Sequence, residues 1–187
     1  MRMQIRNSRQ GYGLVAVTLH WIIAFIVFAM FGLGLYMVDL DYYHPWYTDA
    51  PDLHRSIGIV LLALVSARLI WRLSNPQPAP VAGHGQLQRL AAAIVHWLLY
   101  LDLFIVMISG YLISTADGRS IDVFGLFDLP ALLPAEKGRE ELAGIVHWYA
   151  ALVLVSMAGL HAAAALKHHF IDRDETLRRM LGPSAGK

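Results

Sequence analysis

Four long runs of apolar residues, separated by short polar connections, dominate the pattern of the chain. They cover approximately Leu14–Val38, His54–Leu73, Leu90–Ser114 and Leu142–Leu166. Each run is long enough to cross a bilayer as a helix, which needs about 20 residues at a rise of about 1.5 Å per residue. The pattern predicts an all-α fold, an integral membrane four-helix bundle. Because the connections are short, we expect residues 1–187 to form a single domain.

Composition agrees with a membrane protein, and the distribution of charge predicts its orientation. The chain is 57% hydrophobic and only 16% charged. The N-terminal arm, the second connection with its flanks and the tail hold most of the Lys and Arg: Arg2, Arg6, Arg9, Arg68, Arg72, Arg89, Lys167, Arg173, Arg178, Arg179 and Lys187. The other side has only Arg55, Arg119, Lys137 and Arg139. Cytoplasmic loops carry the excess of Lys and Arg, so both termini are predicted to be cytoplasmic.

Five histidines lie within these predicted helices, where an imidazole without a partner is costly. They are His20, His54, His96, His147 and His161. The last two are separated by fourteen residues of the fourth run, which is about 21 Å along a helix and close to four turns. Both rings therefore leave the helix on nearly the same face. This spacing predicts two layers of histidines, one near each side of the membrane.

Two layers of histidines indicate two haem groups, each with its iron held by a pair of rings. The chain has no cysteine, which excludes covalent attachment through a C-x-x-C-H motif and cysteine-ligated iron–sulfur clusters. We therefore expect two non-covalent haems b. Depth pairs His54 with His147 on the periplasmic side. On the cytoplasmic side His161 pairs with either His20 or His96, and depth alone leaves both choices open.

Further candidates surround these histidines. Arg68 and Arg72, one turn apart, could bind haem propionates or lipid phosphates, and Arg55 follows His54 directly. Gly58 comes one turn after His54 and leaves a gap where a flat ring could lie. Asp102 is an acid in mid-span, which suggests a proton-handling role, a protonated structural acid or a contact with another subunit.

The three connections between the apolar runs differ in composition. The aromatic, acidic loop Asp39–Asp52 could dock a redox partner protein. The loop Ser74–Gly85, rich in proline and glycine, is predicted to be irregular, and we assigned no role to His84 within it. The longest connection, Ala116–Glu140, is apolar in its middle and is interpreted as a short interfacial helix or a lid.

Several motifs resemble the bacterial cytochrome b561 family, most of all its superoxide oxidase (superoxide:ubiquinone oxidoreductase) members. These motifs are LHW at 19–21, LHRSIG at 53–58, RLIWR at 68–72, VHWYA at 146–150 and GLHAAAALKHHF at 159–170. The resemblance implies the iron-ligand pairs His20–His161 and His54–His147, which leaves His96 out. It also implies a quinone near the end of the fourth helix, where His168 lies two turns after His161.

The resemblance therefore implies an enzyme of the bacterial inner membrane. We expect it to oxidise superoxide to dioxygen on the periplasmic side and to pass the electrons through two haems to ubiquinone. The alternative is a cytochrome b subunit that carries electrons between a partner dehydrogenase or hydrogenase and quinone. The expected partners are lipid, ubiquinone, superoxide and a possible redox partner protein, with no nucleic acid.

Overall fold

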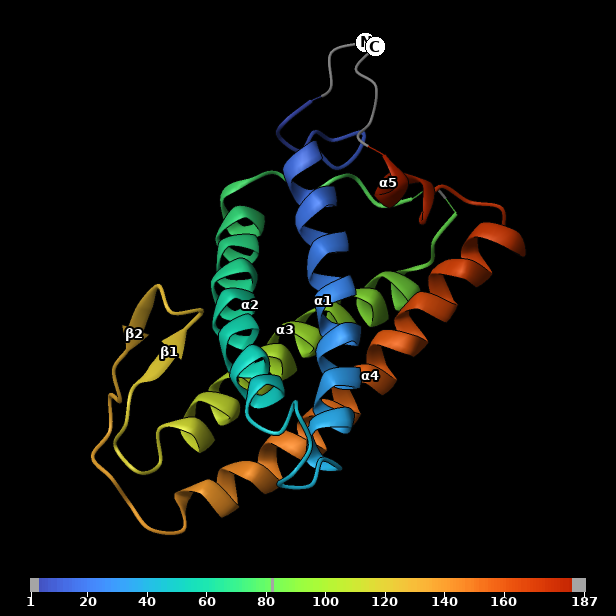
Figure 1. Ribbon diagram of the computed structural model, residues 1–187. Helices are drawn as coiled ribbons and strands as arrows, with labels where there is room; N and C mark the ends of the chain where they lie inside the picture. Colours follow the sequence, from blue (N-terminus) through green and yellow to red (C-terminus); the bar gives the residue numbers. More distant parts are fainter. Residues whose placement is uncertain (1–3, 82, 183–187) are drawn as a thin grey trace. The chain divides into compact units, whose positions relative to one another are not determined.

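The computed structural model describes residues 4–81 and 83–182 (Figure 1). Its elements follow in the order α1 (Leu14–Val38), α2 (Asp49–Ser74), α3 (Gln86–Ser114), β1 (Ile121–Val123), β2 (Phe127–Leu129), α4 (Arg139–Phe170) and α5 (Arg178–Leu181). Two of the basic residues behind the predicted orientation, Arg2 and Lys187, lie outside the described residues. The all-α fold with four long helices is confirmed.

Three of the long helices, α2, α3 and α4, begin several residues before the apolar runs that predicted them. The additional residues are mainly polar and form the first helical turn. The helix α2 starts five residues before the predicted His54, with Asp49 and Asp52 in its first turn. Acidic side chains there interact favourably with the positive end of the helix dipole, and a proline such as Pro51 is tolerated in a first turn. Helix α4 likewise begins with Glu140 and Glu141 and ends with basic residues.

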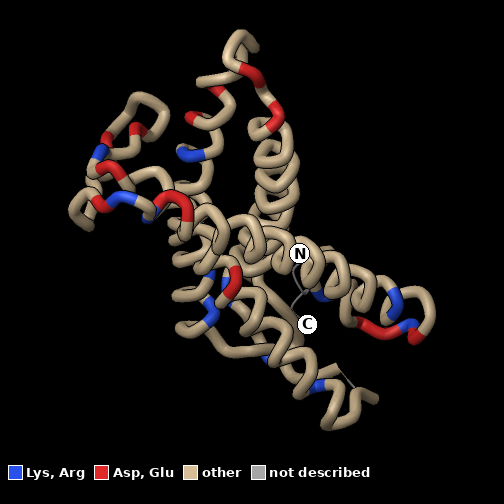
Figure 2. Tube along the Cα trace, turned by 90° about the horizontal axis from the view of Figure 1, so that it is seen from below, with Lys and Arg blue, Asp and Glu red and all other residues tan. Residues whose placement is uncertain are grey.

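The long helices have the surface of membrane spans. In the described chain, four helices are long and apolar enough to cross a membrane, and only 6–22% of their most apolar windows is buried within the protein. Large apolar side chains are exposed along them, among them Phe25 at 76% and Leu160 at 72%. Water would make such surfaces unfavourable, whereas lipid makes them the natural exterior. Charged residues gather mainly in connections and near helix ends (Figure 2).

The chain divides into two compact units, and each long helix contributes a segment to both. The first unit comprises the described parts of Met1–Ala24, Leu64–Tyr100 and Ser156–Lys187, and the second comprises Phe25–Ala63 and Leu101–Val155. In the first unit, the indole nitrogen of Trp21 donates a hydrogen bond to the carbonyl of Met180 and so attaches α5 to α1. The single-domain organisation stays a prediction.

The longest connection contains a β-hairpin, so the interpretation as a short interfacial helix is wrong. Strands β1 and β2 pair antiparallel, with Val123 opposite Phe127. The turn has positive φ at Phe124 (55°) and Gly125 (67°), values that suit the tight turn of a hairpin. The alternation of buried Ile121 and Val123 around exposed Asp122 is the strand signal that the sequence contained, over only three residues.

Side chains from two long helices hold this hairpin. The hydroxyl of Ser56 on α2 donates to the carbonyl of Asp122 and accepts from the amide of Phe124. The hydroxyl of Tyr111 on α3 donates to the carbonyl of Pro130 and accepts from the amide of Leu132. Short strands of this kind depend on such tertiary contacts because an isolated hairpin is marginally stable in water.

Candidate functional site

In the second unit, two histidines from different helices face each other. His54 lies near the start of α2 and His147 lies on α4. Their ring centres are 6.2 Å apart, with planes inclined by 73°. The ring nitrogen Nδ1 of His54 is buried without a hydrogen-bond partner among the described residues. Depth in the sequence predicted that these two rings would meet, and the structure brings them together.

Hydrogen bonds determine which nitrogen of His147 is free to bind a metal. Its Nδ1 lies 2.8 Å from the carbonyl oxygen of Val106 and 3.3 Å from the hydroxyl of Ser109, both on α3. A carbonyl oxygen can only accept, so Nδ1 carries the proton and Nε2 keeps its lone pair. This arrangement is typical of metal-bound histidines, whose second nitrogen is oriented by a neighbouring carbonyl or carboxylate.

Glycines make room beside both rings. A Cβ atom added at Gly34 on α1 would lie 3.4 Å from Cε1 of His54, and one added at Gly110 on α3 would lie 3.0 Å from Cε1 of His147. At Gly58, the glycine singled out in the sequence, the nearest atom would be Cε of Met30 at 3.9 Å. Sequence reasoning missed Gly34 and Gly110, although glycine at a helix contact in membranes often permits close approach.

These rings and glycines line a large cavity within the second unit. Its volume is about 940 Å³ and its walls are mainly apolar. That volume lies near the upper end of the range of about 300–1,000 Å³ that is usual for cofactor pockets. The cavity lining includes His54, His147, Gly34, Gly58 and Gly110. It can therefore hold a large flat group between two histidines.

Charged residues line the same cavity, and most of its cations have acidic neighbours. Arg55 pairs with Asp52, Arg119 with Asp117, and Arg139 outside the lining pairs with Glu136 at 2.8 Å. Lys137, an exposed residue, also belongs to the lining. Hydrogen bonds from Arg119 lower the pKa of Asp117. Much of the positive charge here is thus compensated locally.

In the first unit, two histidine rings lie close to the ring of His161 on α4. The ring of His20 on α1 lies 6.4 Å from it, centre to centre, and the ring of His96 on α3 lies 5.3 Å from it. Nδ1 of His20 is buried without a hydrogen-bond partner among the described residues. The structure thus brings together His20, His96 and His161, all the histidines that the sequence assigned to the cytoplasmic side.

The two arginines at the end of α2 belong to the same unit. The guanidinium of Arg68 lies 5.7 Å from the ring centre of Tyr100, and that of Arg72 lies 5.5 Å from the ring of Trp97. Cations over aromatic faces at this distance are attracted by the ring quadrupole.

Asp102 on α3 is buried, with a residual exposure of 8%. Its Oδ2 atom has no hydrogen-bond partner within the described part of the chain. Its role stays a prediction.

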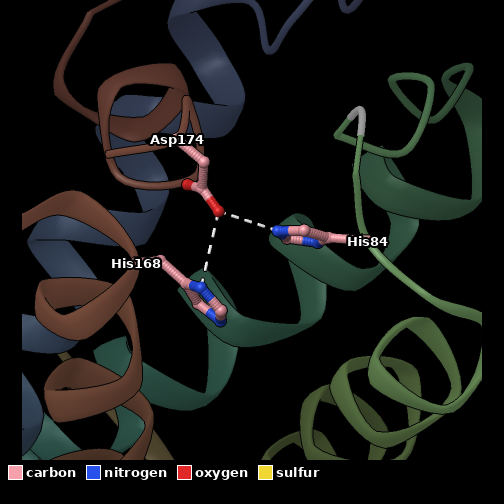
Figure 3. Close-up of side chains that lie close together, drawn as sticks. All are labelled: His84, His168 and Asp174. Carbon is pink, nitrogen blue, oxygen red and sulfur yellow. Dashed lines mark hydrogen bonds and ion pairs between the residues drawn. The ribbon is translucent and has the colours of Figure 1, made fainter. Parts of the chain in front are cut away.

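At the end of α4, His168 meets residues that the sequence did not connect with it. His84 from the loop before α3 and Asp174 from the tail lie beside it (Figure 3). Burial raises the pKa of Asp174, but hydrogen bonds from His84 and Thr176 outweigh this effect and lower it to about 2. The carboxylate is therefore ionised at neutral pH. His84 is the residue that sequence reasoning missed, because only the fold brings its loop to the tail.

Comparison with known proteins identifies the family. A family model described as prokaryotic cytochrome b561 matches residues 11–183. The chain belongs to the prokaryotic cytochrome b561 family. It is 48% identical over 183 residues to "Cytochrome b561 homolog 2" of Escherichia coli (strain K12), covering 98% of this chain and 97% of that protein.

The chain is also similar to two further proteins, which have different names. The chain is 32% identical over 181 residues to "Probable superoxide oxidase CybB" of Yersinia pestis, covering 94% of this chain and 98% of that protein. It is 28% identical over 130 residues to "Cytochrome b561 homolog 1" of Escherichia coli (strain K12), covering 70% and 73% of the two chains.

Membership of the cytochrome b561 family means a membrane electron-transfer protein with b-type haem. The residues of the second unit fit such a group. They offer facing histidines, an Nε2 lone pair on His147, glycines beside both rings and a cavity of sufficient size.

Gly110→Ala should perturb the haem spectrum because the new methyl group meets Cε1 of His147 at 3.0 Å. The ring must then shift by a few tenths of an ångström, which changes the orientation of a metal-bound imidazole. We expect a shifted reduced α-band and a lower haem content per polypeptide, measured by redox difference spectroscopy. Gly32→Ala is the matched control, because its Cβ meets nothing within 4 Å. Identical spectra for the two variants would contradict the close packing at Gly110.

Proposed function

We propose that this cytochrome b561 oxidises superoxide to dioxygen and passes the electrons through two haems b to ubiquinone. Two superoxide anions each lose one electron, and the quinone takes up both electrons and two protons to become quinol. The proposal is supported by the similarity to the probable superoxide oxidase of Yersinia pestis over nearly the whole chain. The observation that carries its electron-transfer part is the presence of two facing histidine pairs, one in each unit, whereas superoxide as the donor rests on the similarity to that relative.

The ring separations support axial ligation by His54 with His147 and by His20 with His161. Two imidazoles that would together hold one metal, each through a nitrogen at about 2.0–2.1 Å, would have ring centres about 6 Å apart. The observed separations of 6.2 Å and 6.4 Å agree with this value. The separation of 5.3 Å between His96 and His161 is short for that arrangement. We therefore assign His96 a neighbouring role.

Bound haem supplies reversible one-electron chemistry, whose potential depends on the axial ligands, burial and hydrogen bonds. The chain's own contribution is positional. The carbonyl of Val106 orients His147, while Gly34 and Gly110 leave the rings unobstructed. Arg68 and Arg72 in one unit and Arg55 in the other are the proposed partners of haem propionates, since a guanidinium pairs well with a carboxylate.

His168 is the proposed quinone-binding residue. It lies near the end of α4, where a quinone head group can reach both the membrane and water. Its Nε2 lies 3.2 Å from the side-chain nitrogen of Gln88 and its Nδ1 lies 2.6 Å from Asp172. A histidine so placed can donate a hydrogen bond to a quinone carbonyl and can act as a general acid. Asp172, whose pKa is lowered chiefly by its hydrogen bond from Lys167, connects it to the exterior.

The same proposal places the protein in the bacterial inner membrane with both termini cytoplasmic. The excess of Lys and Arg in the arm, the second connection and the tail supports that orientation. Superoxide would then arrive at the cavity of the second unit, whose lining includes Lys137 and the ion-paired Arg55 and Arg119.

A second candidate is a cytochrome b subunit that exchanges electrons with a partner dehydrogenase or hydrogenase. The ion pairs of Arg55, Arg119 and Arg139 favour it, because neutralised cations attract a superoxide anion weakly. The aromatic loop at 39–52 would be the docking surface. Both candidates use the same histidines, so the electron donor must be tested directly.

Stopped-flow mixing of the purified protein with superoxide, with and without ubiquinone, tests the function. We expect rapid haem reduction by superoxide and continuous turnover when quinone is added. If the cations of the cavity collect superoxide, the rate should fall with added salt, because the Debye length is only about 10 Å at 0.1 M ionic strength. Lys137→Gln should lower the low-salt rate, and Lys167→Gln is the control. A rate that rises with salt would favour the partner-subunit function.

His20→Ala should remove one haem, whereas His96→Ala should leave both haems six-coordinate. The reason is the ring separation from His161, which suits iron ligation for His20 and is short for His96. Haem content after acid–acetone extraction and the spectrum of the oxidised protein measure this difference. Loss of a haem in the His96 variant alone would reverse the assignment.

His168→Ala should slow re-oxidation of the reduced protein by ubiquinone about tenfold or more, the scale expected for loss of a positioned proton donor. The haem spectra and the reduction by superoxide should not change. His169→Ala is the control, because the neighbouring residue points about 100° away around the helix. Re-oxidation at the normal rate in the His168 variant would show that quinone binds elsewhere.

A further inference from the structure

Three polar side chains from distant parts of the chain converge in the first unit, outside the histidine layers. His84 belongs to the loop before α3, His168 to the end of α4, and Asp174 to the tail (Figure 3). Nε2 of His84 lies 2.7 Å from Oδ2 of Asp174, and Nδ1 of His168 lies 3.4 Å from the same oxygen. One nitrogen or oxygen from each of the three residues lies within 4.8 Å of the others.

The spacing of these atoms suits a small divalent cation. Ligand atoms at about 2.0–2.1 Å from a tetrahedral zinc ion lie about 3.3 Å from one another. The separation of 3.4 Å between His168 and Asp174 already has this value. The separation of 2.7 Å between His84 and Asp174 is that of a hydrogen bond and must open by about 0.6 Å to reach this value. His84 lies in a loop, which can make such an adjustment at low cost.

Neighbouring groups contact two of the three side chains, and one of these contacts orients Asp174 as groups around known metal ligands do. The other carboxylate oxygen of Asp174, Oδ1, accepts a hydrogen bond of 2.8 Å from the amide of Thr176. The side-chain nitrogen of Gln88 lies 3.2 Å from Nε2 of His168, and Nδ1 of His168 lies 2.6 Å from Oδ2 of Asp172, a contact that a metal ion on Nδ1 would replace. The three proposed ligands are also sheltered, with side-chain exposures between 13% and 17%.

The backbone directs Asp174 towards the histidines at some cost. Arg173 has a φ of 54°, in the left-handed region that residues other than glycine rarely adopt. This turn returns the chain onto α4, where the amide of Asp174 donates to the carbonyl of His168 at 3.0 Å. A turn of this kind at a non-glycine residue persists only when the surrounding contacts support it.

The local charge balance favours a cation. The ammonium of Lys167, the basic group closest along the chain to His168, donates to both carboxylate oxygens of Asp172. That pair is neutral overall, and Asp174 keeps an uncompensated negative charge when both histidines are neutral. The guanidinium of Arg179 is occupied by the carbonyl of Ala79.

We propose that His84, His168 and Asp174 form a binding site for a divalent transition-metal ion of the zinc type. Two imidazole nitrogens and one carboxylate oxygen are ligands that zinc accepts, and three protein ligands leave a fourth position for water or an exogenous group. The site joins the loop before α3 to the tail after α4. It is distinct from the histidines that are proposed to bind haem, which lie within the long helices.

Equilibrium dialysis of the haem-loaded protein against buffered ZnCl₂ tests the site, with zinc and iron counted by mass spectrometry. We expect one zinc ion per chain at micromolar free zinc. His84→Ala and Asp174→Asn should each weaken binding about a hundredfold, at the upper end of the effect of losing a supporting residue around a metal. His44→Ala and His169→Ala are the matched controls and should bind zinc normally. Unchanged haem spectra confirm that each variant is folded.

Zinc-edge X-ray absorption of the wild-type protein gives an independent readout. We expect nitrogen and oxygen neighbours at about 2.0–2.1 Å with the outer-shell pattern of two imidazoles. The variants at His84 and Asp174 do not alter the proposed quinone ligand, so this test can fail without affecting the proposed function. Absence of zinc at micromolar concentration, or full binding by both variants, would overturn the site and leave an ordinary ion pair between loop and tail.

Discussion

The cost of placing imidazole rings among apolar helices is the constraint on which the rest of this structure depends. A polar ring in hydrocarbon must find a partner, and here the rings face one another from different helices. His54 and His147 meet in one unit, and His20, His96 and His161 meet in the other. Each meeting determines which face of its helix turns inward. The remaining faces carry the large apolar side chains that lipid accepts.

Small residues and backbone carbonyls determine how closely the histidine rings pack and how they are oriented. Because Gly110 has no side chain, the ring of His147 can approach α3 closely enough for its Nδ1 to bond the carbonyl of Val106. That bond leaves Nε2 as the free lone pair. A side chain at Gly110 would displace the ring, and loss of the carbonyl acceptor would leave its tautomer undetermined. The chemistry of the site is therefore built into the packing of the helices around it.

Different interactions stabilise the residues around His168, because these residues lie outside the apolar spans. Hydrogen bonds between charged and polar groups hold the tail to the loop before α3, and the left-handed turn at Arg173 directs Asp174 to this point. A cluster with two histidines and an ionised carboxylate can bind a cation, and it also lies beside the proposed position of quinone. Ion binding and electron transfer are proposed for separate groups of residues that share only His168.

The amino-acid sequence alone determined the four membrane helices and the pairing of His54 with His147. Long apolar runs must form helices in lipid, and histidine spacing along a helix specifies depth. Only the tertiary structure showed that the rings of His20 and His96 lie at different distances from His161, because the two residues have similar depth in the sequence. It also decided the hairpin at 121–129, whose three-residue strands depend on Ser56 and Tyr111. The meeting of His84 with Asp174 was equally beyond the sequence, since residues 90 positions apart become neighbours only through the path of the folded chain.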